Sequence, residues 1–107
     1  MNEVDLLRPL EALLMTAILV QNNSAYGAGI FDRAVELAKP AKVSYGSLYP
    51  TLERLEKKGF LKSKFGDPIP ERGGKSRRYF SVTGAGQAAL RRSEAFAVGL
   101  AQAWGTA

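Results

Sequence analysis

The stretch Val43–Leu61, with the sequence VSYGSLYPTLERLEKKGFL, decides the fold of this chain. Leu48, Leu52 and Leu55 recur in it at helical spacing, which predicts one buried face of a helix. Gly59 follows two lysines after the last periodic residue, which is how a helix typically ends. Four side chains point away from the leucine face, so this helix can present a short reading surface: Ser47, Pro50, Arg54 and Lys57.

The same stretch resembles the recognition helix of the PadR family of bacterial transcription regulators. The resemblance covers residues 8–92, in the right order, and rests on Tyr26-Gly27, Ser44–Leu52, Arg54–Glu56, Lys58–Leu61, Arg77–Phe80 and Val82–Gly86. It implies a mainly α fold with a small two-stranded β-wing. Residues 1–83 would form a winged helix-turn-helix DNA-binding domain, and residues 84–107 a C-terminal dimerisation helix in the same compact unit. Because that last helix is short, the chain resembles the compact subtype of the family.

The composition restricts the chemistry that the chain can perform. Its 107 residues predict one domain, and they include no cysteine and no histidine. Disulfides, histidine bases and metal sites with nitrogen or sulfur ligands are therefore excluded, and we expect no cofactor and no enzyme. No apolar run reaches membrane-spanning length and the N-terminus lacks a secretory pattern, so we expect a cytoplasmic protein.

The positive charge is concentrated in one part of the chain. The formal net charge is +5, but residues 44–92 alone hold eleven lysines or arginines and four acidic residues. Such an uneven distribution favours a polyanionic partner, because neutralised phosphates release counterions and supply much of the affinity. The alternative is a basic surface that only keeps the protein soluble.

Two helices are expected before the reading helix. The first carries an apolar stripe at helical spacing and can begin at Pro9, because first-turn amides have no partner within the helix. The second is expected at Tyr26–Ala38, with Ser24 as its cap and with Gly27 and Gly29 marking the close approach of a neighbouring helix. The stripes are Leu10, Leu13, Leu14, Ala17 and Ile18 in the first helix, and Ile30, Phe31, Ala34, Leu37 and Ala38 in the second.

Pro50 leaves two starts open for the reading helix. If Ser44 is the cap, Pro50 lies in the second turn, where it removes a hydrogen bond and kinks the helix. If Ser47 is the cap, Pro50 falls in the first turn without penalty. Since a proline at this place resembles the family pattern, we favour a helix from Ser44 to Lys58 with a distorted start.

The segment after the reading helix predicts a hairpin and a last helix. Phe60–Phe65 and Ser76–Val82 alternate as strands around a tip rich in turn residues, which predicts a two-stranded wing. Thr83 is the expected cap of a helix that runs to Trp104. Its residues Ala89, Ser93, Phe96, Leu100 and Ala103 are three or four positions apart, which is typical of a packing seam.

The resemblance implies a homodimer that binds operator DNA and represses transcription. Expected base contacts on double-stranded DNA are Ser44, Tyr45, Ser47, Tyr49 and Pro50. Expected phosphate or groove contacts are Arg54, Lys57, Lys75, Arg77 and Arg78. For Tyr49, which lies at the edge of the buried face, packing and DNA contact are equally good interpretations.

The dimer interface is expected to form between the last helix of one subunit and the first helix of its partner. Its residues would be Leu10, Leu13, Leu14, Ala89, Phe96, Leu100, Ala103 and Trp104. In multidrug-binding members of the family an aromatic residue of the last helix lines a pore at this interface, which leaves room for a small-molecule effector. Here Phe96 or Ala97 falls at that place, and Trp104 lies farther along.

Two other functional classes remain. A winged-helix module that binds protein would keep its partner when the basic face is mutated and would bind DNA weakly. A small hydrolase using Ser, Asp or Lys is the other alternative, but no nucleophile has an obvious base nearby.

Overall fold

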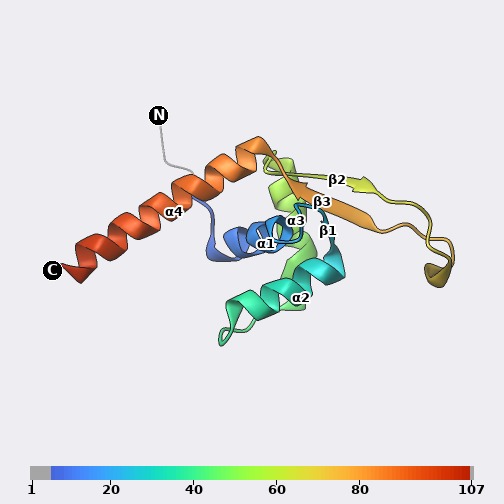
Figure 1. Cartoon of the computed structure of the whole chain (residues 1–107), viewed down its shortest axis with the longest axis horizontal. Helices are drawn as coiled ribbons and strands as arrows, with labels where there is room; N and C mark the ends of the chain where they lie inside the picture. Colours follow the sequence, from blue (N-terminus) through green and yellow to red (C-terminus); the bar gives the residue numbers. More distant parts are fainter. Residues whose placement is uncertain (1–5, 107) are drawn as a thin grey trace.

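The computed structural model describes residues 6–106. Four α-helices, three short strands and two 3₁₀ turns follow one another within that range (Figure 1). They are α1 (Pro9–Leu19), β1 (Ala25–Tyr26), α2 (Gly27–Ala38), η1 (Tyr45–Ser47), α3 (Leu48–Lys57), β2 (Leu61–Phe65), η2 (Pro70–Arg72), β3 (Arg78–Val82) and α4 (Gly84–Gly105). The β2–β3 hairpin and the C-terminal part of α4 extend from opposite sides of the body, as Figure 1 shows.

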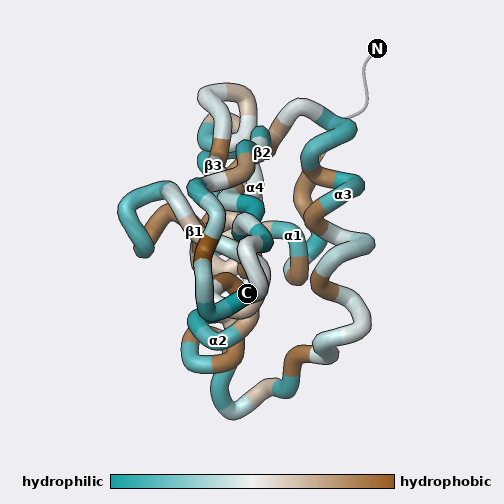
Figure 2. Tube along the Cα trace, turned by 90° about the vertical axis from the view of Figure 1, so that its right-hand side faces the viewer, coloured by the Kyte–Doolittle hydropathy of each residue, from teal (hydrophilic) through white to brown (hydrophobic). Residues whose placement is uncertain are grey.

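The core is built around α1, which contacts α2, α3 and β3. Leu14, Met15 and Ile18 of this helix have no exposed surface. On the opposing elements the buried side chains are Ile30, Ala34, Leu48, Leu52, Leu55, Leu61, Phe80 and Val82. Burying side chains of this size stabilises the fold by about 1.5–3 kcal/mol each. In Figure 2, α3 stands at one side of this core, with hydrophilic and hydrophobic segments alternating along its trace.

In the first two helices, the stripe residues Leu14, Ala17, Ile18, Ile30 and Ala34 are buried, and Leu10, Leu13, Phe31 and Ala38 are half-buried. Leu37 in the last turn of α2 is exposed, so the expectation that it faces inward is wrong. Gly27 is buried, and a Cβ atom there would lie 2.0 Å from the Tyr49 hydroxyl oxygen of α3. This confirms the close approach of a neighbouring helix at Gly27.

The sheet has three strands instead of the two expected from sequence. Its order is β1-β3-β2, with both pairs antiparallel. Asn23 explains the extra strand, because its side chain accepts a hydrogen bond from the Val82 amide (2.7 Å) and donates one to the Val82 carbonyl (3.1 Å). The following residues are thereby held in pairing distance of β3. Ser24 is therefore not the cap of α2, whose cap position is Tyr26.

The reading helix starts differently from the expectation. A 3₁₀ turn covers Tyr45–Ser47, and the α-helix itself begins at Leu48. Pro50 therefore lies in the first turn of α3, where its missing amide costs no hydrogen bond. The predicted distortion is present, but a continuous α-helix from Ser44 is wrong.

The last helix begins as predicted. The Thr83 hydroxyl accepts a hydrogen bond from the Gly86 amide (3.1 Å) and thereby caps α4. Gly86 and Ala89 anchor the first turns in the core, whereas residues 94–106 are exposed. Among residues 6–106, no helix is both long and apolar enough to cross a membrane.

Candidate nucleic-acid interface

The outward face of α3 follows from its buried face. With Leu48, Leu52 and Leu55 inside, helical geometry places Pro50, Glu53 and Lys57 at the centre of the opposite side. All three of these residues are exposed. This face is the surface that α3 can offer to a partner, and it includes an acidic residue that the sequence reasoning missed.

Aromatic side chains gather where the chain enters α3. Tyr45 stacks edge-on against Phe31 of α2 (5.0 Å between ring centres) and against Tyr49 (6.3 Å). Tyr45 and Tyr49 nevertheless remain 54% and 45% exposed. Tyr49 thus both packs, with its hydroxyl against Gly27, and presents surface to solvent. Ser44 and Pro50 are exposed and Ser47 is half-buried, so all five expected base-contact residues lie at this end of α3.

The Tyr49 hydroxyl feels both its burial and nearby charges. Burial, the largest cause, and the neighbouring Tyr45 raise the pKa of the Tyr49 hydroxyl, while the positive charge of Arg72 opposes them. Arg72 is the last residue of η2 at the tip. The tip turns at Gly73 and Gly74, whose φ angles of 66° and 83° favour glycine.

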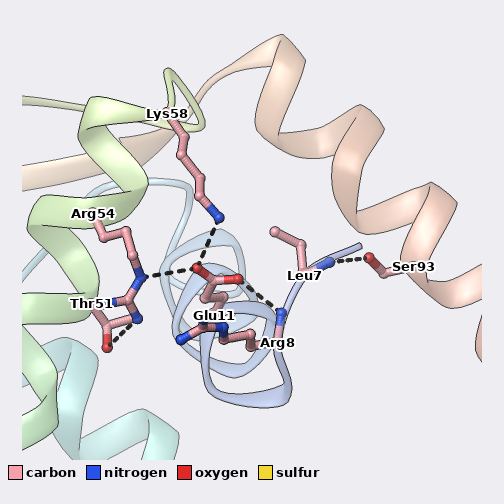
Figure 3. A network of polar contacts seen from close by, with 7 residues as sticks. All are labelled: Leu7, Arg8, Glu11, Thr51, Arg54, Lys58 and Ser93. Carbon is pink, nitrogen blue, oxygen red and sulfur yellow. Dashed lines mark hydrogen bonds and ion pairs between the residues drawn. The ribbon is translucent and has the colours of Figure 1, made fainter. Parts of the chain in front are cut away.

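Arg54 faces the protein body instead of a partner. Its Nε lies 3.3 Å from Glu11 Oε2 on α1, and its Nη2 donates to the Thr51 hydroxyl. Figure 3 shows Arg54 of α3 and Lys58 at its C-terminal cap converging on Glu11, which has no exposed surface. The guanidinium of Arg54 is thus paired with the body, because the buried carboxylate requires a positively charged partner, although the Arg54 side chain stays 39% exposed.

Glu11 connects three parts of the chain. Its Oε1 accepts a hydrogen bond from the Arg8 amide (2.8 Å), and the adjacent Leu7 amide donates to Ser93 Oγ of α4 (3.0 Å; Figure 3). Burial raises the pKa of the Glu11 carboxyl group, but the hydrogen bonds from Arg8 and Arg54 and the charge of Lys58 outweigh it, so the pKa is lowered. Glu11 is therefore ionised and fixes α3 against α1.

The wing arginines are also bound within the protein. Arg78 donates to Glu53 Oε1 (2.8 Å), to Ser63 Oγ (3.0 Å) and to Glu56, and its guanidinium lies over the Phe80 ring. Burial disfavours the charge of Arg78, but the two glutamates outweigh this and raise its pKa. These contacts join the hairpin to α3.

Arg77 packs on the other edge of the sheet. Its guanidinium lies 4.3 Å from the centre of the Tyr26 ring, and its Nε is buried without a hydrogen-bond partner among the described residues. Lys57 and Lys75 differ from the three arginines, because both are exposed and neither forms an ion pair within residues 6–106.

The expected interface residues divide into two groups. Leu14 and Ala89 are fully buried in the core of one chain, so they cannot contact a partner, and that part of the expectation is wrong. Leu10 and Leu13 are half-buried. Phe96, Leu100, Ala103 and Trp104 are exposed along α4, with Trp104 79% exposed.

The chain matches a known family over most of its length. The model of the transcriptional regulator PadR-like family matches residues 15–92. None of the curated proteins matches the chain.

Solved structures share the fold. A PadR family regulator from Eggerthella lenta is 28% identical, with a TM-score of 0.70, over 91% of this chain and 83% of that one. A transcriptional regulator from Clostridium thermocellum is 18% identical, with a TM-score of 0.73, over 91% of this chain and 87% of that one. A PadR-like regulator from Bacillus cereus is 20% identical, with a TM-score of 0.70, over 91% of this chain and 88% of that one. With a helix-turn-helix, a β-wing and a family match over residues 15–92, this chain belongs to the PadR-like family of transcriptional regulators.

Proposed function

We propose that the chain represses transcription as a homodimer that binds an inverted-repeat operator, with α3 in the major groove and the wing on the DNA backbone. The observation that carries this proposal is the uncovered outward face of α3 beside a basic hairpin. Lys57 lies on that face, and the hairpin carries four exposed cations, which are Lys62, Lys64, Arg72 and Lys75. A protruding helix flanked by a positive wing fits the width and charge of the major groove.

Base contacts are assigned to the start of the reading helix. Ser44, Ser47 and Tyr45 bring hydroxyl groups that can donate to or accept from base edges. Pro50 presents an apolar ring that suits a thymine methyl group. Tyr49 adds its exposed ring edge, while its hydroxyl stays against Gly27.

Phosphate contacts are assigned to exposed cations. Lys57 on α3 and Lys75 on the hairpin are exposed and therefore available to DNA. Arg54, Arg77 and Arg78 are given a positioning role instead, because each is held by a contact within the chain. An arginine must break such a contact before it can bind a phosphate.

The contact with the second copy of the chain is assigned to the apolar part of α4. Phe96, Leu100 and Trp104 expose about half of their surface or more on a helix whose second half projects from the body (Figure 1). A row of exposed large apolar residues is typical of an interaction surface. The half-buried Leu10 and Leu13 of α1 offer an apolar surface that can complete the interface.

The place assigned to a small-molecule effector is the groove between α1 and α4. This groove has a volume of about 460 Å³ and is lined by apolar side chains that include Leu7, Ala12, Leu90 and Ala97. Because α4 also carries the proposed dimer surface, occupancy of the groove would act on the spacing of the two reading helices.

The experiment that tests the proposed function is footprinting of the full-length protein on the DNA upstream of its own gene. We expect two protected half-sites related by a twofold axis and spaced about 34 Å apart, one turn of DNA. Transcription from that fragment in vitro should fall as the protein is added. Equal binding to operator and scrambled duplexes would contradict specific recognition, and protection without any fall in transcription would contradict repression.

A further inference from the structure

An acidic side chain occupies the centre of the reading surface. Glu53 lies three residues after Pro50 and four before Lys57, on the outward face of α3. Its side chain is 52% exposed. A carboxylate at this position is repelled by the phosphates of any DNA that α3 approaches, so it weakens non-specific binding.

Arg78 orients this carboxylate from the wing. Its Nη1 donates to Glu53 Oε1 at 2.8 Å, which fixes one carboxylate oxygen and partly neutralises the charge. Within residues 6–106, Oε2 of Glu53 has no hydrogen-bond donor. The ion pair therefore leaves the second oxygen of a half-exposed carboxylate free to accept a hydrogen bond.

Glu53 is not needed to hold Arg78 in place. The arginine also contacts Glu56, Ser63 Oγ and the Phe80 ring, and Ser63 in turn donates to Glu56 (2.8 Å). These contacts anchor the hairpin to α3 without Glu53. Attachment of the hairpin to α3 therefore does not account for the exposed carboxylate of Glu53.

We propose that Glu53 is a specificity-determining residue whose Oε2 accepts a hydrogen bond from the exocyclic amino group of a cytosine in the major groove. This inference rests on the proposed DNA-binding function. A carboxylate only accepts hydrogen bonds, so it pairs with the N4 amino group of cytosine and is repelled by the acceptor edges of guanine and thymine. Arg78 is the positioning residue for this contact.

The test is selection of binding sites from a random duplex library, with wild-type protein and the variants Glu53→Ala, Glu53→Gln and Glu36→Gln. In Glu53→Ala we expect the preference for cytosine at one position of each half-site to fall by about 5- to 150-fold, the discrimination of one good base contact. In Glu53→Gln the preference at that position should move toward adenine, because glutamine both donates and accepts. Preferences at the other positions should stay as in the wild type.

Glu36→Gln is the matched control. It removes one exposed carboxylate charge on α2, outside the network of Glu53 and Arg78, so its base preferences should equal those of the wild type. Circular dichroism of each variant checks the fold, and the near-isosteric Glu53→Gln decides the question if Glu53→Ala is unfolded. Unchanged preferences in folded Glu53→Gln would overturn the assignment while leaving DNA binding intact. A wild-type protein that selects no sequence at all would overturn both this inference and the proposed function.

Discussion

Arg54 Nε lies 3.3 Å from Oε2 of Glu11, so an arginine of the reading helix neutralises a fully buried carboxylate on α1. The two residues are 43 positions apart in the chain. Lys58 contacts the same oxygen at 3.4 Å. Arg54 of α3 and Lys58 at its C-terminal cap therefore fix the helix against the core, and these ion pairs separate them from the unpaired cations assigned to DNA.

This ion pair predicts how stability depends on pH. The pKa of Glu11 in the folded protein lies below its ordinary value of 4.5, so the ionised carboxylate stabilises the fold above that value. The stabilisation should be lost as the pH falls below 4.5 through the folded-state pKa. Glu11→Gln should lower the free energy of unfolding at pH 7 by about 1–3 kcal/mol and flatten this acid dependence.

Denaturant unfolding of wild type and variant from pH 7 to pH 3 measures both effects. Glu36→Gln is the control, because Glu36 pairs with Arg33 on the exposed surface of α2 and its loss should cost less than about 1 kcal/mol. Parallel acid dependences for wild type and Glu11→Gln would contradict an ionised, paired Glu11.

The contact between Gly27 and Tyr49 predicts a dependence between two substitutions. A Cβ atom at residue 27 would lie 2.0 Å from the Tyr49 hydroxyl oxygen, so Gly27→Ala must displace the tyrosine ring. We expect Gly27→Ala to cost about 1–3 kcal/mol, as overpacking typically does, and to weaken operator binding by moving a reading residue. In a Tyr49→Ala background the same substitution should cost little. Thermal unfolding of the four proteins completes the cycle, and equal costs in both backgrounds would exclude the steric explanation.

The assignment of Lys57 and Lys75 to phosphates predicts how substitutions change the salt dependence of DNA affinity. Lys57→Ala and Lys75→Ala should each reduce the slope of log affinity against log salt by about one unit per subunit, because each removes one phosphate contact. Arg92→Ala, on the exposed side of α4, removes the same charge away from the reading helix and should leave the slope unchanged. Titrations on operator and scrambled duplexes at several salt concentrations provide the measurement. A salt dependence close to zero for the wild type would argue against DNA binding altogether.

The apolar row on α4 predicts the oligomeric state. Wild-type protein at micromolar concentration should sediment as a dimer, and Leu100→Asp should sediment as a monomer because it places a charge in the proposed interface. Gln102→Asp adds the same charge at a position turned away from Leu100 and should stay dimeric. Since Leu100 is 55% exposed in the single chain, circular dichroism should show an unchanged fold for both variants. A dimer of undiminished stability in Leu100→Asp would place the interface elsewhere.

The sequence by itself determined the elements whose signals are local. Leucines at helical spacing defined the buried face of α3, and the Thr83 hydroxyl was sufficient to locate the start of α4, because both depend on residues within one or two turns. The hairpin followed from alternation and turn residues in the same way. The family motifs were also contiguous in the chain, so the resemblance found them before any contact was known.

Only the tertiary structure decided which charges are available to a partner. Arg54 and Lys57 differ little in a linear pattern, yet one pairs with a buried carboxylate 43 residues away and the other is exposed. β1 is two residues long, which is too short to show the alternating pattern of a strand. Its pairing depends on the Asn23 side chain, which contacts Val82, 59 residues away. Such contacts depend on packing between distant segments, and a one-dimensional pattern carries no information about which distant partner a side chain will meet.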